Sequence, residues 1–401
     1  MHPHIPVHDL WWLAAGGAGY GTRYARQRVR IARSKAHRAG LPDPTDNLLR
    51  LQTLYGYNPH SLVSIAPGAS AWTMPGIDGA IIYSEFNRVW LAAGDPLARP
   101  QDVTALTRGF IAAAHQAGRL AAFVPATHRF AHEATTLGLS AIKIGAAPYI
   151  DLTTWESRGN RGKKIRAGVN QARRAGVRVE VVQDLDDKLK TEAADLCLSW
   201  LKSRRAATSF GWLLALDPFL RAERKKLFVA RDKQDRLVGL LAASPIPTRN
   251  GWYLEDVVRQ PDAPRGTAEL LIFYALGELQ SLGASLATLG TAPLAKDGDD
   301  DISTRDHPVL ERALLSTAMR LSRFYNFDGL RRFKAKFVPS WWESEYALVQ
   351  HGVMVPTKVA HALLQAVVPG GVPQLLTRKA LQSISPQRSH TRISSIESAP
   401  F

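Results

Sequence analysis

Cysteine is nearly absent from this chain of 401 residues: Cys197 is the only one. A single cysteine cannot form a disulfide framework or a cysteine-ligated zinc site, and this usage fits a reducing compartment. Cys197 lies in an apolar stretch with helical periodicity, so we expect it to pack in a core.

Long apolar runs are also absent, since none reaches the ~18–20 residues needed to span a bilayer. Residues 10–18 are apolar, but the run is short and no basic segment precedes it, so no signal peptide is expected. The 12 histidines are scattered without suitable acid or cysteine neighbours, and no Walker loop, dinucleotide fingerprint or nucleophile elbow occurs. We therefore expect a cytoplasmic protein with no metal site.

Acidic residues are outnumbered by basic ones, 35 against 51, which gives a formal charge of +16. Such an excess attracts phosphate-rich partners, either nucleic acid or an anionic membrane, although a chain can also be merely basic. Hydrophobic residues make up 45% of the chain, enough for real cores. The length suits two domains with terminal extensions.

Apolar runs bounded by turn residues predict an α/β protein in which two units repeat one arrangement of strands, a long helix and more strands. The predicted strands are 88–93, 120–124, 148–152, 226–231, 236–243, 251–258, 285–289 and 345–350. The predicted segments are a basic lead-in helix (1–45), a first unit (46–157), basic linking helices (158–205), a second unit (206–350), and a C-terminal helix with a disordered tail (351–401).

The lead-in carries Trp11 and Trp12, and residues 23–38 then contain seven Lys or Arg and no acid. Indole rings at lipid headgroups and cations on phosphates would hold such a segment on an anionic membrane. A solvated basic helix explains the same pattern equally well.

The most informative stretch is the basic segment 158–178. At about 100° per residue, Ile165, Val169, Ala172 and Gly176 fall on one side of a helix and the cations fall on the other. A solvated charged face is the ordinary alternative, but such faces usually interleave acids for i,i+4 pairing, and no acid occurs between residues 158 and 179. We therefore expect this helix to track a phosphate backbone. The candidate contacts are Lys163, Lys164, Arg166, Arg173 and Arg174.

A second candidate site begins at the strand 251–258. Asp256 lies near its end beside Glu255, and strand alternation predicts that the two side chains point to opposite faces. A carboxylate facing a cleft could hold a substrate ammonium group or act as a base, whereas an edge or capping acid is the plain alternative. Arg265-Gly266-Thr267 then opens a helix whose free N–H groups could receive a phosphate; the matching loop of acyl-CoA acetyltransferases holds pyrophosphate.

Cations and aromatic rings alternate in 329–346. Arg331, Arg332, Lys334 and Lys336 lie among Phe333, Phe337, Trp341 and Trp342. This mixture suits a phosphate joined to an apolar or stacking group, such as a lipid phosphate or a tRNA end. A basic helix end whose aliphatic stems cover a core is the alternative.

Taken in order, these pieces resemble the cytosolic catalytic region of the bacterial phosphatidylglycerol lysyltransferases, also called multiple peptide resistance factors, over about residues 46–350. The matching pieces are Gly94-Asp95-Pro96-Leu97, Lys143-Ile144-Gly145, Ile150-Asp151-Leu152, the basic helix from Gly162 to Gly176, Trp200-Leu201, Phe210-Gly211, Glu255 to Arg259, Leu289 to Leu294, and Gly329 to Phe337.

The resemblance implies tandem GNAT-like (acyl-CoA N-acyltransferase-like) domains with mixed central sheets flanked by helices. It implies transfer of an amino acid, lysine or alanine, from aminoacyl-tRNA to phosphatidylglycerol in the inner leaflet, with no cofactor and with the enzyme peripheral to the membrane. The modified lipid is less anionic and binds cationic peptides less well.

By the same likeness, Asp256 contacts the aminoacyl group, Arg331 with Lys334 holds the lipid phosphate or the tRNA end, and the basic helix binds the tRNA acceptor stem. The candidate catalytic residues are Asp256, Glu255 and Arg331. The candidate substrate-binding residues are Arg259, Arg265, Arg332, Lys334 and Lys336.

The chain departs from the family at two points. Ala146 and Ala147 stand where the family usually has two acids, and the membrane flippase half is absent. Two alternatives therefore stay open: a GNAT-type transferase with a peptide or cell-wall acceptor or an acyl-CoA donor, and a non-catalytic binder of RNA or anionic membrane.

Overall fold

The structure, a computed structural model, describes residues 44–160, 162–203, 216–298, 302, 327–350, 358–359 and 361–362. The basic lead-in with Trp11 and Trp12, the piece Phe210-Gly211 and nearly all of the predicted C-terminal segment lie outside these residues.

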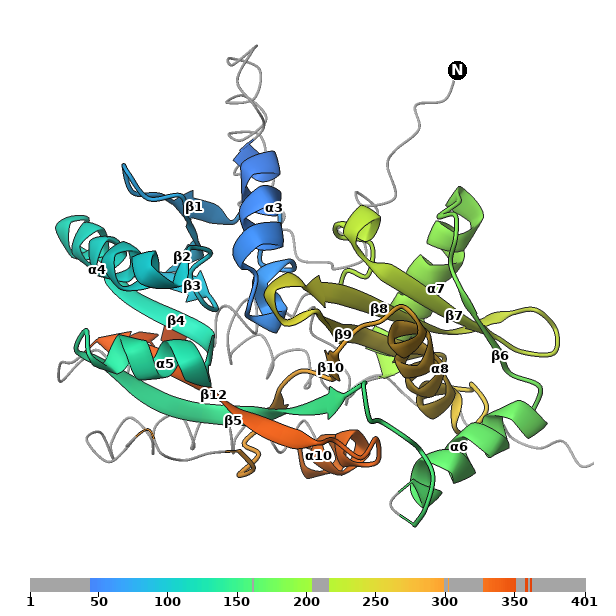
Figure 1. Ribbon diagram of the computed structural model, residues 1–401. Coiled ribbons are helices and arrows are strands. Elements are labelled where there is room, and N and C mark those ends of the chain that lie inside the picture. Colours follow the sequence, from blue (N-terminus) through green and yellow to red (C-terminus); the bar gives the residue numbers. More distant parts are fainter. Residues whose placement is uncertain are drawn as a thin grey trace, which may run out of the picture.

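One mixed sheet of twelve strands runs through the described part of the chain, in the order β1-β2-β3-β4-β12-β5-β10-β9-β8-β7-β6, with β11 paired to β5 (Figure 1). The strands are β1 Ser70–Trp72, β2 Ile81–Phe86, β3 Val89–Ala93, β4 Leu120–Thr127, β5 Leu139–Asp151, β6 Arg178–Val181, β7 Lys226–Arg231, β8 Leu237–Ile246, β9 Gly251–Arg259, β10 Leu286–Thr288, β11 Ala292–Pro293 and β12 Trp341–Gln350. The helices are α3 Pro44–Tyr55, α4 Pro100–Gln116, α5 His128–Thr135, α6 Lys163–Arg174, α7 Asp187–Ser203, α8 Thr267–Ser281 and α10 Phe327–Ala335, with the short 3-10 turns η1 Pro59–Ser61, η3 Ala222–Arg224 and η4 Pro247–Arg249.

Each half of the sheet repeats one arrangement. An antiparallel pair comes first (β2 with β3, or β8 with β9), and a helix then crosses over to a parallel neighbour. In the first half α4 connects the parallel strands β3 and β4, and in the second half α8 connects β9 and β10. The predicted α/β class, with mixed strands flanked by helices and one arrangement used twice, is confirmed.

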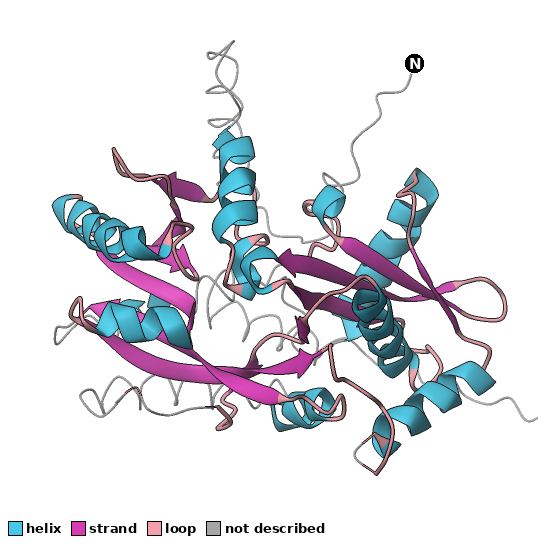
Figure 2. Cartoon of the chain, in the orientation of Figure 1, coloured by secondary structure: helices cyan, strands magenta, loops and turns pink. Residues whose placement is uncertain are grey.

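The two halves meet at the long strands β5 and β12. Strand β5 belongs to the first half but pairs with β10 of the second, and β12, the last strand of the described residues, lies between β4 and β5. The sequence predicted strands only at 148–152 and 345–350, so both are longer than expected. Residues from both halves are therefore brought together along this seam (Figure 2).

Helices cover both faces of the sheet. In the second half, Leu241 and Ala243 of β8 pack in the core beneath α6 and α8, while their neighbour Leu240 packs in the core beneath α7. In the first half, Leu106 and Phe110 of α4 are fully buried, which agrees with their spacing of four residues on one helical face. Full burial of one such side chain contributes about 1.5–3 kcal/mol. Cys197 is one of the buried residues of α7, which confirms its predicted core position.

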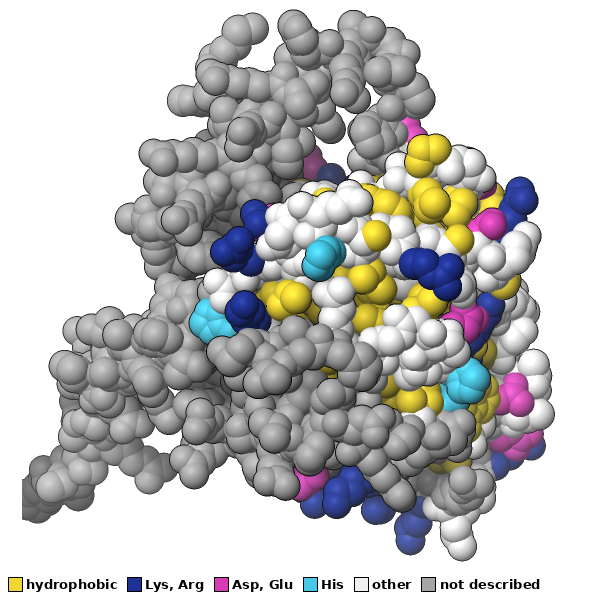
Figure 3. Space-filling model, turned by 90° about the vertical axis from the view of Figure 1, so that its left-hand side faces the viewer, with side chains coloured by type: hydrophobic (Ala, Val, Ile, Leu, Met, Phe, Trp, Pro, Cys, Tyr) yellow, Lys and Arg dark blue, Asp and Glu magenta, His cyan; other side chains and the backbone are white. Residues whose placement is uncertain are grey.

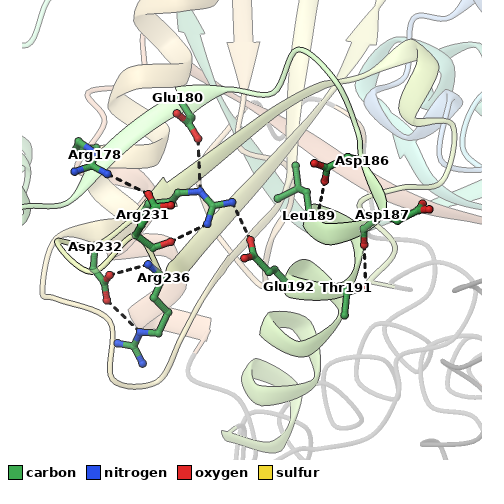
Figure 4. Close-up of polar contacts among 11 residues, drawn as sticks. Arg178, Glu180, Asp186, Asp187, Leu189, Thr191, Glu192, Arg231, Asp232 and Arg236 are labelled. Atoms are coloured by element: carbon green, nitrogen blue, oxygen red, sulfur yellow. Dashed lines mark hydrogen bonds and ion pairs between the residues drawn. The ribbon is translucent and has the colours of Figure 1, made fainter.

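The helical prediction for all of 158–205 was wrong between the two helices. Residues Arg178–Val181 form β6, which pairs antiparallel with β7. Gly176 adopts φ +84 just after α6 and ends the helix, as a residue without Cβ can. Arg178 then pairs with Asp235, and Glu180 pairs with Arg231 across the strands (Figure 4). The alternation Arg-Val-Glu-Val has the two-residue period of a strand. It was overlooked because the basic residues of the preceding helix continue up to it.

Candidate functional site

Helix α6 is amphipathic in the structure, as predicted. Its residues Ile165, Val169 and Ala172 are buried in the core that α8 also lines. The opposite side carries the exposed cations Lys163, Lys164, Arg173 and Arg174. The fifth predicted contact, Arg166, is only half-buried and donates a hydrogen bond to the carbonyl of Ser157, so it secures the loop before the helix.

Figure 3 shows a different side of the molecule, the left-hand side of Figure 1, where α4 and α5 lie. Apolar side chains are prominent there, and Lys and Arg side chains stand apart over most of the described surface, although several gather at the lower edge. The cations of α6 lie on another part of the molecule, at the lower right of Figure 1.

The helix end predicted to receive a phosphate is covered by protein. Gly266, with φ +89, precedes α8, and a Cβ built there would come within 2.0 Å of the carbonyl oxygen of Gly168 in α6. Thr267 is fully buried, and its hydroxyl donates to the carbonyl of Pro264. Arg265 is exposed beside this end. A pyrophosphate at the start of α8 would have to displace α6.

The acids of β9 lie at an irregularity in the ladder. Ala242 of β8 pairs with Asp256, and the next residue, Ala243, pairs with Leu254, so Glu255 is the extra residue of a β-bulge. Strict alternation fails there, and the prediction that the two acids point to opposite faces was wrong. Glu255 forms a buried ion pair with Lys225 and accepts a 2.9 Å hydrogen bond from Ser244.

Asp256 has no hydrogen bond or ion pair among the described residues. Burial raises the pKa of its carboxyl well above the usual range, and the neighbouring charge of Glu255 raises it further, while Lys225 opposes both. Burial also raises the pKa of the Cys197 thiol, and the charge of Asp256 contributes, which places Asp256 toward α7. The result is a carboxyl group with unused hydrogen-bonding capacity beside an ion pair, so an incoming cation would restore its charge.

The basic residues of α10 separate into different environments. Arg331 donates two hydrogen bonds to Asp297, at 2.5 and 2.6 Å, and its guanidinium lies 5.7 Å from the ring centre of Trp342. Lys336 pairs with Glu269 at 2.9 Å. Arg332 is exposed. These cations remain near the surface, whereas Lys334 does not.

Lys334 points into the seam between the two halves and is 8% exposed. Its ammonium nitrogen donates to the carbonyls of Gly290 and Thr291, at 2.8 and 2.7 Å. Burial lowers the Lys334 pKa to about 7, although the charge of Glu345 raises it. Lys334 and Arg331, which were predicted to act together, therefore have separate partners.

Sequence reasoning missed the other polar side chains of this seam. Glu345 of β12 is buried, and burial raises its pKa to about 7. His60 of η1 is also buried, and its ring centre lies 5.0 Å from that of Tyr253 on β9. No spacing in the sequence connects these residues with Lys334; the one signal was the motif piece Leu289 to Leu294, which contains both carbonyls.

Arg249 stabilises another part of the seam between the two halves. The sequence did not reveal it as a candidate. The guanidinium of Arg249 lies 4.9 Å from the ring centre of Tyr57 and 4.3 Å from that of Tyr149. It also pairs with Glu343 of β12. One face of Tyr149 stacks on Trp341, with centroids 5.5 Å apart and planes at 7°. This layered contact joins η4 to both long strands.

The remaining candidates lie at the periphery. Arg259, at the end of β9, is exposed and donates to the carbonyl of Gln260. Ala146 and Ala147 are fully buried in β5, so they line the core rather than a solvent-facing loop. Within the described residues, no group of three or more His, Cys, Asp or Glu could hold a metal ion. The described residues also include no helix long and apolar enough to cross a membrane.

The sequence matches the family described as phosphatidylglycerol lysyltransferase, C-terminal, over residues 50–349. The lysylphosphatidylglycerol biosynthesis bifunctional protein LysX of Mycobacterium avium is 26% identical over 286 residues, which are 69% of this chain and 23% of that protein. Its counterpart from Nocardia farcinica is 25% identical over 323 residues, 78% of this chain and 28% of that protein. The chain thus spans about a quarter of the length of these relatives.

Two solved structures share the fold. The C-terminal domain (DUF2156) of a putative lysylphosphatidylglycerol synthetase from Agrobacterium fabrum is 25% identical with a TM-score of 0.67, covering 82% of this chain and 98% of that chain. L-PGS from Bacillus licheniformis is 21% identical with a TM-score of 0.68, covering 80% of this chain and 96% of that chain.

Proposed function

This chain belongs to the family of phosphatidylglycerol lysyltransferase C-terminal regions, and we propose that it moves an aminoacyl group from aminoacyl-tRNA to the headgroup of phosphatidylglycerol. The observation that carries the proposal is the half-buried carboxyl of Asp256, which has no hydrogen bond or ion pair among the described residues. Because burial raises its pKa, this acid is suited to an incoming cation that would restore its charge. The α-ammonium group of an aminoacyl ester is such a cation.

The acceptor stem of the donor would bind the exposed side of α6, and its aminoacyl end would extend past the sheet to Asp256 on the α7 face. Lys163, Lys164, Arg173 and Arg174 are exposed, and α6 packs directly on α8, the helix that follows β9. A row of cations along one helix face can neutralise successive phosphates of an acceptor stem, while Asp256 holds the aminoacyl end. We assign Glu255 to maintaining this arrangement through its ion pair with Lys225.

The lipid phosphate would bind near the exposed Arg332 and near Arg331, whose guanidinium is already oriented by Asp297 and Trp342. Arg259, Arg265 and Lys336 would contribute long-range attraction. The enzyme would work at the inner face of the membrane, with the basic lead-in assisting attachment. Phosphatidylglycerol is the acceptor that the names of the relatives support.

The chemistry requires no covalent enzyme intermediate. An aminoacyl ester is already activated, so its transfer to a hydroxyl depends on positioning and on stabilising charge. An acyl-CoA donor is disfavoured because α6 covers the start of α8, where such a donor would place its pyrophosphate.

The test combines cells and purified components. Mass spectrometry of lipids from a host expressing the chain should show aminoacylated phosphatidylglycerol. In vitro, lysyl- or alanyl-tRNA with vesicles containing phosphatidylglycerol should give the same product, and ribonuclease treatment of the donor should abolish it. A lipid extract without any aminoacylated product, together with no tRNA-dependent transfer in vitro, would refute the proposal.

The assignment of Asp256 needs its own variants. Asp256→Asn keeps the shape of the side chain but cannot hold an ammonium group by charge, so transfer should fall at least about 10-fold with RNA binding unchanged, the cost of a lost charged hydrogen bond. Asp184→Asn removes an exposed acid elsewhere and serves as the matched control. Equal rates for the two variants would remove Asp256 from the site.

A further inference from the structure

Lys334 is a buried lysine, and a buried position is unusual for a charged side chain. Its side chain is buried where α10 meets the loop between β10 and β11, and the seam strands β5 and β12 lie next to that loop. Two backbone carbonyls, of Gly290 and Thr291, accept hydrogen bonds from its nitrogen, and the described residues offer no third acceptor to it.

Counting protons distinguishes the two forms of this nitrogen. An ammonium group has three N–H bonds, of which the two carbonyls satisfy two, so the third is left without an acceptor. A neutral amine has two N–H bonds, both satisfied, and a lone pair that is free for another molecule. The site is thus complete for the amine and incomplete for the ammonium, which agrees with a Lys334 pKa lowered to about 7 by burial.

Glu345 provides the opposite charge. It is 4% exposed, and its Oε2 is buried without a hydrogen-bond partner among the described residues. Burial raises its pKa to about 7, while the Thr291 hydroxyl and the charge of Lys334 lower it. An unsatisfied buried carboxylate oxygen costs free energy, so a donor that completes it would be stabilised there.

Other titratable groups lie on the elements packed around Lys334 and Glu345. Among the described residues, none of these groups adds a positive charge to this pair. His60 of η1 is held neutral because burial, and then the charge of Lys334, lower its pKa to about 4. Tyr253 of β9 keeps its proton because burial and nearby acids raise its pKa. Glu343 of β12 and Asp95, which follows β3, both act to raise the pKa of Glu345.

The orientation of His60 is also fixed. The side-chain amide of Asn58 donates to Asp95 and to the carbonyl of Pro125, at 2.9 and 2.8 Å, so its oxygen faces His60 Nδ1 at 3.3 Å. The imidazole therefore carries its proton on Nδ1 and adds no positive charge beside Lys334.

We propose that Lys334, in its amine form, is a catalytic residue that takes the proton of the acceptor hydroxyl during transfer, with Glu345 as the positioning residue that stabilises the ammonium so formed. The inference rests on the proposed function. The hydroxyl oxygen forms a bond to the aminoacyl carbonyl carbon while its proton passes to Lys334 Nζ. The bond between that carbon and the ribose oxygen of tRNA breaks, and Lys334 returns the proton to the ribose oxygen.

From the sequence, Lys334 was predicted to bind a phosphate. Phosphate binding and proton transfer predict opposite changes of the rate with pH. A phosphate contact needs the ammonium, so the rate would fall as pH rises through 7. A proton acceptor needs the amine, so the rate should rise about tenfold per pH unit below 7 and level off above it. Single-turnover transfer from aminoacyl-tRNA to phosphatidylglycerol vesicles between pH 5.5 and 8.5 separates the two roles.

Variants test the same distinction. Lys334→Arg keeps a cation but cannot be deprotonated, so the rate should fall at least about 100-fold with little change in KM. Glu345→Gln removes a charge that favours the ammonium, so the rising part of the pH profile should move to lower pH. Lys188→Arg, at an exposed lysine of α7, is the matched control. A Lys334→Arg enzyme with more than a tenth of the wild-type rate, or a rate that falls above pH 7, overturns the proposal.

A measurement that needs no transfer keeps this inference separate from the proposed function. In full-length protein labelled at the ε-carbon of lysine, one NMR resonance should titrate near pH 7 and should be missing from Lys334→Arg. If that resonance titrates above pH 9, Lys334 is an ordinary cation and the proposal fails. If it titrates near pH 7 but no transfer to lipid occurs with wild-type protein, the proposed function fails and the acceptor is to be sought elsewhere.

Discussion

The exposed cations of α6 give the sharpest quantitative prediction. Each phosphate neutralised on a duplex contributes about 0.9 to the slope of log affinity against log salt concentration. Lys163, Lys164, Arg173 and Arg174 are all exposed, and they spread over the half of the helix that lies away from the buried residues. If all four contact an acceptor stem, replacing them together by alanine should reduce the slope by about 3 to 4 and lower the affinity by about 10³-fold at 0.1 M salt.

The assay is the binding of fluorescently labelled tRNA, measured by fluorescence anisotropy between about 50 and 300 mM salt. A graded series is informative: Lys164→Ala with Arg173→Ala should reduce the slope by about 2, half of the full effect. Arg88→Ala with Arg108→Ala removes the same charge from exposed positions in the first half and is the matched control.

The control pair distinguishes a specific surface from overall charge. It should alter the slope by less than about 0.5, because residues that touch no phosphate release no counterion. Equal slopes for the α6 pair and the control pair would refute the reasoning, since the +16 charge would then act as a whole and α6 would have no special place.

Three further predictions concern stability. Gly266→Ala should lower the free energy of unfolding by at least about 2 kcal/mol in urea titrations, because of its left-handed φ and the approach to Gly168; a loss below about 0.5 kcal/mol would contradict the packing of α6 on α8. His60, whose pKa is lowered to about 4 from 6.5, binds its proton more readily in the unfolded chain, so stability should decline by about 3 kcal/mol from pH 6.5 to pH 4 and His60→Gln should remove that part of the decline; identical acid profiles would argue against its burial. Lys225→Met should cost about 3–5 kcal/mol because it leaves Glu255 buried without its cation, and adding Glu255→Gln should restore part of the loss; a double variant no more stable than the single one would argue against the ion pair.

Local patterns in the sequence carried most of the fold. The apolar period of 3.6 in Leu106 and Phe110, and the runs that became β7, β8 and β9, depend on burial of neighbouring residues, which the order of residues records directly. The amphipathic character of α6 is of the same kind: Ile165 and Val169 alternate with cations at helical spacing, and the structure buries the former and exposes the latter. For that reason the sequence alone predicted the net charge of the protein, its α/β class and the repeated arrangement of its elements.

The sequence by itself therefore determined an α/β protein with an acid-free cationic helix and an acidic pair on one strand. Only the tertiary structure decided what those groups face. Glu255 and Asp256 are neighbours on a bulge, and whether a residue bulges depends on the partner strand rather than on its own alternation. Lys334 and Arg331 look equivalent in sequence, yet Lys334 is buried with its nitrogen on two carbonyls and under the charge of Glu345, while Arg331 pairs with Asp297 near the surface. Burial, and with it the pKa of Lys334, follows from β12 entering the sheet between β4 and β5, a long-range pairing that no local spacing records.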